Sequence, residues 1–139
     1  MSSTTIDVGD VLLLRSRFTN PPKDKFHVVV CVTPSIQAFL INTRMSPFVM
    51  ARPKRQADYE LVTVGDMPWL GQKRYIDVGD VFPIGPDELE ELEQGPERRR
   101  TRIPPSVARR LLERVDASVS LSARNKRQIR AGLVSMLAG

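Results

Sequence analysis

Two apolar segments joined by a short turn constrain the fold of this chain more than any other feature. The first, residues 25–33, reads Lys-Phe-His-Val-Val-Val-Cys-Val-Thr, and the second, residues 36–44, reads Ile-Gln-Ala-Phe-Leu-Ile-Asn-Thr-Arg. Runs rich in β-branched residues on both sides of a turn predict a β-hairpin inside a sheet. Because the strands of a hairpin run antiparallel, we expect the polar groups at its open end to lie side by side.

The open end of this hairpin carries polar and ionisable side chains: Lys25, His27, Asn42, Thr43 and Arg44. Cleavage of RNA without a metal needs a group that assists loss of the 2′-hydroxyl proton, a donor to the leaving oxygen, and cations that hold the phosphate. Of these side chains, only the imidazole of His27 has an ordinary pKa suited to proton transfer near neutrality. Strand alternation predicts that Phe26 and Val28 face the interior and that Lys25 and His27 face outward. The alternative is that these groups merely end two strands at the surface.

Composition excludes several other classes of site. A single cysteine, Cys31, cannot build a disulfide framework or a cysteine-rich metal site, and a single histidine cannot build a two-histidine zinc site. Residues 65–73 contain glycines and a lysine but lack the ending of a nucleotide-binding loop. We therefore expect no metal and no cofactor. Residues 1–7 do not resemble a signal peptide and no apolar run has the length of a membrane span, so we expect a cytoplasmic protein with no membrane partner.

The order of the remaining patterns predicts strands first and helices afterwards. Residues 15–24 and 45–59 are expected to be loops, and residues 96–102 a basic linker. The predicted strands are residues 11–14, the two hairpin segments, 59–64 and 73–82, and the predicted helices are 86–94, 104–119 and a last one that begins at Ser120 or Ser122. This order favours a small antiparallel β-barrel followed by C-terminal helices.

Charge is distributed unevenly along the chain. Residues 1–94 contain 10 Lys/Arg and 13 Asp/Glu, whereas residues 95–139 contain 11 Lys/Arg and 3 Asp/Glu, so net charges of −3 and +8 sum to +5. We therefore predict a barrel domain with one short helix over residues 1–95 and a basic appendage of two helices over residues 96–139. Such an appendage favours a polyanionic partner, and the alternative is that its arginines only solvate helix faces.

Several segments together resemble the MazF/PemK superfamily, the RNA-cleaving toxins of toxin–antitoxin pairs. The resemblance covers about residues 6 to 94 and depends on a Gly-Asp-Val turn before the first strand and on three further segments, which are His27-Val28-Val29-Val30, Leu40-Ile41-Asn42-Thr43 and Lys73-Arg74-Tyr75-Ile76-Asp77. Because that family has a small SH3-like barrel, the resemblance implies an α+β fold: a small SH3-like antiparallel β-barrel followed by C-terminal helices. It also implies a homodimer that binds a cognate antitoxin protein.

The resemblance also implies site residues. Thr43 matches the threonine of the family's catalytic site, and Lys25 stands where the family has its catalytic arginine. Lys25-Phe26 replaces an Arg-Pro dipeptide of the family, and lysine keeps the charge but loses the planar grip on phosphate. Either His27 compensates for this change or the site is idle.

The expected function is therefore that of a metal-independent endoribonuclease acting on single-stranded RNA. Its expected catalytic residues are Lys25, His27 and Thr43, and its expected RNA-binding residues are Arg44, Arg52, Lys54 and Arg55. One alternative is a catalytically inactive barrel that binds nucleic acid or protein, with recognition by the basic C-terminal segment. Another is a structural subunit of a larger assembly.

Overall fold

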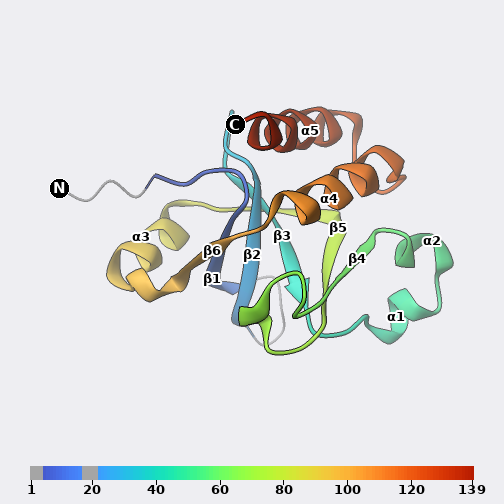
Figure 1. Ribbon diagram of the computed structural model, residues 1–139, viewed down its shortest axis with the longest axis horizontal. Coiled ribbons are helices and arrows are strands. Elements are labelled where there is room, and N and C mark those ends of the chain that lie inside the picture. Colours follow the sequence, from blue (N-terminus) through green and yellow to red (C-terminus); the bar gives the residue numbers. More distant parts are fainter. Residues whose placement is uncertain (1–4, 17–21) are drawn as a thin grey trace.

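A six-stranded antiparallel half-barrel sheet followed by C-terminal helices forms a mixed α+β fold (Figure 1). The computed structural model describes residues 5–16 and 22–139, so residues 1–4 and part of the loop predicted over residues 15–24 lie outside the described chain. The strands are β1 (Asp10–Ser16), β2 (Lys23–Cys31), β3 (Gln37–Asn42), β4 (Tyr59–Val62), β5 (Arg74–Pro83) and β6 (Arg99–Arg102). The helices are α1 (Pro47–Met50), α2 (Pro53–Gln56), α3 (Pro86–Gln94), α4 (Pro105–Ala117) and α5 (Ala123–Ala138).

The predicted hairpin is present and forms the centre of the sheet. β2 pairs antiparallel with β3, with Phe26 opposite Ile41 and Val28 opposite Phe39. The strand order β4-β5-β3-β2-β1-β6 gives each of these two strands a neighbour on both sides. Central strands are shielded from water on both faces, which explains their nearly continuous apolar sequence. Phe39 is completely buried.

The two faces of the sheet bury two separate sets of side chains. Val28, Val30 and Phe39 belong to the larger core, which also contains residues of α4 and α5. Val29 and Ala38 point to the other face and pack with Leu92 of α3. Because successive side chains of a strand alternate between faces, the apolar runs of β2 and β3 supply both cores at once.

The C-terminal segment completes the sheet and the larger core. Residues 96–102, predicted as a linker, form a short 3-10 turn and the strand β6, which pairs with β1. The apolar stripes of α4 and α5 are buried on the sheet, and they include Val107, Leu111, Val115, Ile129 and Leu133. Residues 1–95 and 96–139 therefore share one sheet and one core, because amphipathic helices need an apolar face to cover.

The contact between α5 and β2 is close enough to require a glycine. A Cβ atom on Gly132 would come within 2.5 Å of the carbonyl oxygen of Val30. The segment between β3 and β4, predicted to be irregular, contains the one-turn helices α1 and α2, each with a proline in its first turn. Within residues 5–16 and 22–139, no helix combines the length and the apolar composition that a bilayer crossing requires.

Candidate functional site

The side chains at the open end of the hairpin lie together. The register of β2 and β3 places Lys25 beside Asn42, and the Lys25 Nζ donates a hydrogen bond to the Asn42 Oδ1. Lys25 is half-buried, and this burial lowers the pKa of its ammonium group. The positive charge of Lys23 lowers that pKa further. The antiparallel pairing thus produces the juxtaposition that the sequence predicted.

Two adjoining hollows open at this end of the sheet. The first, the Arg74 hollow, has a volume of about 190 Å³ and is lined by Lys23, Lys25, Thr43 and Arg74 among others. The second, the Arg44 hollow, has a volume of about 270 Å³ and is lined by Lys23, Lys25, Thr43 and Arg44 among others. The structure therefore brings Lys25 and Thr43 to one place, because both line both hollows.

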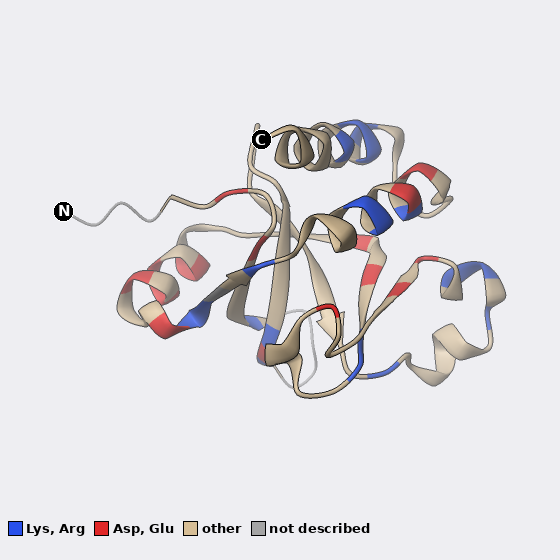
Figure 2. Cartoon of the chain, viewed as in Figure 1, with Lys and Arg blue, Asp and Glu red and all other residues tan. Residues whose placement is uncertain are grey.

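Positive charge dominates this end of the sheet. Blue segments mark Lys and Arg near the lower ends of the strands in Figure 2. Among the described residues that line the two hollows, the only carboxylate is that of Asp24. Its Oδ2 lies 3.4 Å from an Nη of Arg98, which offsets its charge. An anion such as a phosphate is the ligand that this distribution attracts.

Arg74 belongs to this site although it was not among the residues predicted for it. It begins β5, and the register of β3 and β5 places Asn42 opposite the next residue, Tyr75. The Nε and Nη2 atoms of Arg74 both donate to the carbonyl oxygen of Leu70 at 3.4 Å, and its guanidinium carbon lies 5.4 Å from the ring centroid of Phe26. Arg74 could not be assigned to the site from the sequence, because its position beside β3 depends on the strand order. The sequence does not state that order.

His27 does not reach the hollows. Its side chain is 4% exposed, and its neighbours across the strands are Leu12 and Leu40. The prediction that it faces outward is wrong, because the opposite face of the sheet carries a second core under α3. Burial lowers the pKa of the His27 imidazole, against opposing effects of the Lys25 carbonyl and the charge of Glu88. The Nδ1 lies 2.9 Å from the Lys25 carbonyl oxygen, which can only accept, so Nδ1 carries the hydrogen.

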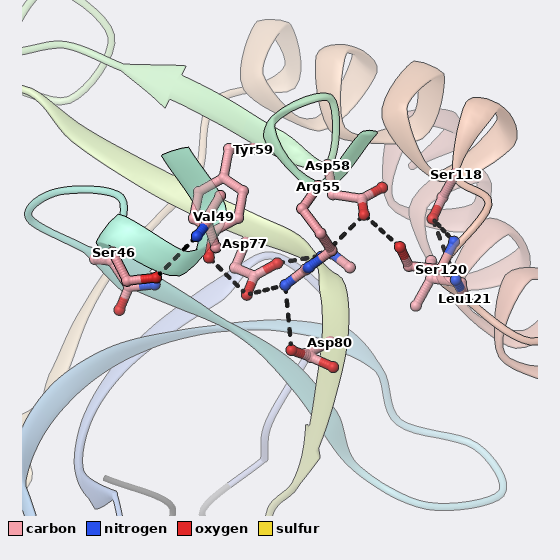
Figure 3. A network of polar contacts seen from close by, with 12 residues as sticks. Ser46, Val49, Arg55, Asp58, Tyr59, Asp77, Asp80, Ser118, Ser120 and Leu121 are labelled. Carbon is pink, nitrogen blue, oxygen red and sulfur yellow. Dashed lines mark hydrogen bonds and ion pairs between the residues drawn. The ribbon is translucent and has the colours of Figure 1, made fainter. Parts of the chain in front are cut away.

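Arg55, predicted to bind RNA, is held by carboxylates (Figure 3). Its Nη1 lies 2.9 Å from the Asp58 Oδ2, and its Nη2 lies 3.4 Å from carboxylate oxygens of both Asp77 and Asp80. A Cβ on Gly79 would stand 1.9 Å from the Arg55 Nη1, so only glycine leaves space for the guanidinium on β5. This arginine fastens α2 to the sheet.

Asp77 and Tyr59 extend the Arg55 cluster towards the Arg44 hollow. The Tyr59 hydroxyl donates to the Asp77 Oδ2 at 3.2 Å, and Tyr59 also lines that hollow. Burial, reinforced by the charge of Asp77, raises the pKa of Tyr59 to about 12. Burial also raises the pKa of Asp77, although the Gly79 N–H and Arg55 oppose the shift. At neutral pH the phenol of Tyr59 therefore stays protonated and remains a donor.

The other cations predicted to bind RNA are distributed differently. Arg44 is exposed and lines the Arg44 hollow. Arg52 is exposed on the α1–α2 segment, where its guanidinium stacks 3.5 Å above the centroid of the Phe48 ring and donates to the Phe48 carbonyl oxygen. Lys54 is exposed on the same segment. Of the predicted RNA-binding set, the structure thus places Arg44 at the Lys25–Thr43 site.

Many arginines of the C-terminal segment form ion pairs with acids of residues 1–94. These pairs, with N···O distances of 2.8–3.4 Å, are Arg98–Asp24, Arg99–Asp10, Arg102–Asp10, Arg110–Glu60, Arg110–Asp66 and Arg114–Glu60. The hydrogen bonds from Arg110 lower the pKa of the Asp66 carboxyl to about 2. Much of the positive charge of residues 95–139 therefore serves to hold this segment to the sheet.

The chemistry available at the site is that of cations and a hydroxyl. Among the residues that the structure describes, no group of three or more His, Cys, Asp or Glu side chains is arranged to hold a metal ion. Lys25 and Thr43 can hold an anion between them, and Arg74 lines one of the two hollows while Arg44 lines the other. Comparisons with known protein families, with curated proteins and with solved structures find no match to this chain.

Proposed function

We propose that this chain binds single-stranded RNA at the Lys25–Thr43 site and cleaves it as a metal-independent endoribonuclease of the MazF/PemK type, built on an SH3-like barrel. The observation that carries the proposal is that Lys25 and Thr43, at the open end of one hairpin, line the same two hollows among further cations. A cognate antitoxin and a second copy of the chain are the protein partners under this proposal, and the cytoplasm is its location.

In the proposed reaction, the 2′-hydroxyl oxygen of one nucleotide attacks the adjacent phosphorus, and the bond from phosphorus to the 5′-oxygen of the next nucleotide breaks. The 2′-hydroxyl proton passes to water. The ammonium of Lys25, whose pKa burial has lowered, gives a proton to the leaving 5′-oxygen. The Thr43 hydroxyl donates to a phosphate oxygen, and the surrounding cations stabilise the charge that develops. The products are a 2′,3′-cyclic phosphate and a 5′-hydroxyl.

Two observations favour a second candidate function, which is RNA binding without cleavage. His27, the residue expected to move a proton, is buried and is not among the described residues that line the hollows. The hydrogen bond from Lys25 to Asn42 also occupies one of the three donors of the ammonium group. A site of this kind retains its cations for binding even if no group accepts the 2′-hydroxyl proton.

A cleavage assay with purified protein tests the proposal. We expect the wild type to cut single-stranded RNA of mixed sequence in the presence of EDTA and to leave a 2′-O-methyl strand of the same sequence intact. Thr43→Ala and Lys25→Ala should each slow cleavage by about 100-fold, the usual cost of removing one transition-state donor. The matched controls are Thr101→Ala and Lys73→Ala, which remove the same side chains at exposed positions outside both hollows.

The outcomes separate the two candidate functions. Intact RNA together with salt-dependent binding that Lys25→Ala weakens supports the binding function and rejects the nuclease. Equal cleavage by the wild type and by both site variants rejects this site as the origin of the activity. A wild type that neither binds nor cuts RNA at low salt contradicts both functions.

A further inference from the structure

We infer that Arg74 supplies the guanidinium that holds the phosphate between Lys25 and Thr43, in place of the arginine that position 25 lacks. The inference rests on the proposed function and adds to it a specific RNA contact, with the phosphodiester of a single strand as the ligand. The two cations come from different strands, Lys25 from β2 and Arg74 from β5.

The strand order explains how Arg74 reaches the same phosphate as Lys25. β3 lies between β2 and β5, and it ends at Asn42, so that Thr43 follows directly at the rim. β2 enters the sheet and β5 begins at this same end, because both run antiparallel to β3. Lys25 and Arg74 therefore flank Thr43 at this rim, and all three residues line the Arg74 hollow.

The Arg74 side chain is held in place before any ligand arrives. The Leu70 carbonyl oxygen accepts from Nε and Nη2, and the guanidinium carbon lies 5.4 Å from the centroid of the Phe26 ring. The ring of Phe26 is in turn packed edge-on against Trp69, with 5.1 Å between their centroids. Such fixation reduces the conformational entropy that a long side chain loses on binding. The N–H groups of Nη1 are not used by the Leu70 carbonyl.

The chemistry of the two cations is complementary. A lysine ammonium acts as a point charge, whereas a guanidinium presents parallel N–H donors that match two oxygens of a phosphate. Position 25 of this chain supplies a lysine ammonium, and Arg74 supplies a guanidinium to the same hollow. A hollow of about 190 Å³ is large enough for one phosphodiester group with part of its ribose. The Arg44 hollow beside it continues the path for a neighbouring nucleotide.

The experiment measures binding of a fluorescently labelled 2′-O-methyl oligoribonucleotide, which cannot be cleaved, by anisotropy at several NaCl concentrations. The proteins are the wild type, Arg74→Ala, Arg74→Lys, Thr43→Ala and the control Lys73→Ala. Lys73 is the adjacent residue, is exposed, and is not among the described residues that line the hollows. Circular dichroism melting of each variant checks that it is folded.

We expect Arg74→Ala to raise Kd about tenfold and to reduce the slope of log Kd against log salt by about 0.7, the value for one phosphate contact in a single strand. Arg74→Lys should weaken binding with the wild-type salt slope, because it keeps the charge and loses the planar donors. Lys73→Ala should stay within about twofold of the wild type.

Some results would overturn the assignment while leaving the proposed function intact. Wild-type binding that is weakened by Thr43→Ala but unchanged in Arg74→Ala is one such result, and equal losses in Arg74→Ala and Lys73→Ala are another. If Arg74→Ala does not fold, the affinity of Arg74→Lys for the oligonucleotide is the test. Wild-type affinity in Arg74→Lys rejects the role of the guanidinium. A wild type that does not bind the oligonucleotide rejects both the assignment and the proposed function.

Discussion

Lys25 and His27 are two residues apart on one strand and share one face of the sheet, yet their surroundings differ. Lys25 lies at the rim, half-buried, with its ammonium bound to Asn42. His27 lies one step further in, between Leu12 and Leu40, where 4% of its surface is exposed. Burial lowers the pKa of both side chains, because a low-dielectric environment disfavours their charged forms. A chemical role for Lys25 is therefore compatible with its position, whereas His27 acts as a neutral packing residue that bonds to the Lys25 carbonyl.

The neutral state of His27 predicts a pH dependence of stability. Its folded-state pKa lies below the ordinary value of 6.5, so the unfolded chain binds more protons as the pH falls below that value. The free energy of unfolding should decrease as the pH drops from about 7.5 to 5.5. Urea unfolding at both values should show a smaller decrease in His27→Gln than in the wild type. An NMR titration that places the imidazole pKa above 6.5 would contradict this account.

At the scale of the elements, the short helix α2 is fixed by an ion cluster instead of by its own stability. α2 has one turn, and such a helix is not stable alone. Arg55 ties it to β5 through Asp77 and Asp80, and to the residues before β4 through Asp58. The side chains of Asp58 and Asp77 are only 3% and 8% exposed, so the guanidinium is needed to offset buried negative charge.

Replacing Arg55 should therefore destabilise the fold. Arg55→Ala leaves the carboxylates of Asp58 and Asp77 buried without their cation, and we expect a loss of about 3 kcal/mol in the free energy of unfolding. Lys54→Ala removes an adjacent exposed cation and should change that free energy by less than about 0.5 kcal/mol. Chemical denaturation of both variants measures the difference, and equal stabilities would show that the cluster does not hold α2.

At the scale of the whole molecule, the helices α4 and α5 belong to the same packed unit as the sheet. They cover one face of the sheet, as Figure 1 shows, and α3 packs on the other face. Arg110 and Arg114 bind Glu60 of β4, while Arg99 and Arg102 of β6 bind Asp10 of β1. The arginines of residues 96–139 thus form ion pairs that hold this segment at both edges of the sheet.

Removal of residues 96–139 should consequently abolish folding. The truncated chain would expose the face of the sheet that carries Val28, Val30 and Phe39, and it would lose the strand that pairs with β1. Far-UV circular dichroism and NMR of residues 1–95 should show a chain without cooperative thermal unfolding or dispersed amide signals. A folded, cooperatively melting fragment would instead support an independent barrel with an appendage.

Local patterns in the sequence were sufficient to predict most elements. The β-branched content of residues 25–33 and 36–44 around a short turn predicted the central hairpin, and the pattern of residues 104–119 predicted α4. Ser122, one of two candidate caps, accepts a hydrogen bond from the Asn125 backbone at the start of α5. The strand β6 was missed, because the run Arg-Arg-Thr-Arg has no apolar alternation and depends on pairing with β1.

What the sequence by itself determined is the set of elements, the central hairpin and, through its antiparallel register, the meeting of Lys25 with Asn42 and Thr43. Only the tertiary structure decided which cations stay available for a ligand. Arg55 pairs with buried carboxylates, His27 is buried within the sheet, and Arg74 comes to the site from β5. The physical reason is that residue type and periodicity are local properties, whereas burial and ion pairing depend on which distant segments pack together.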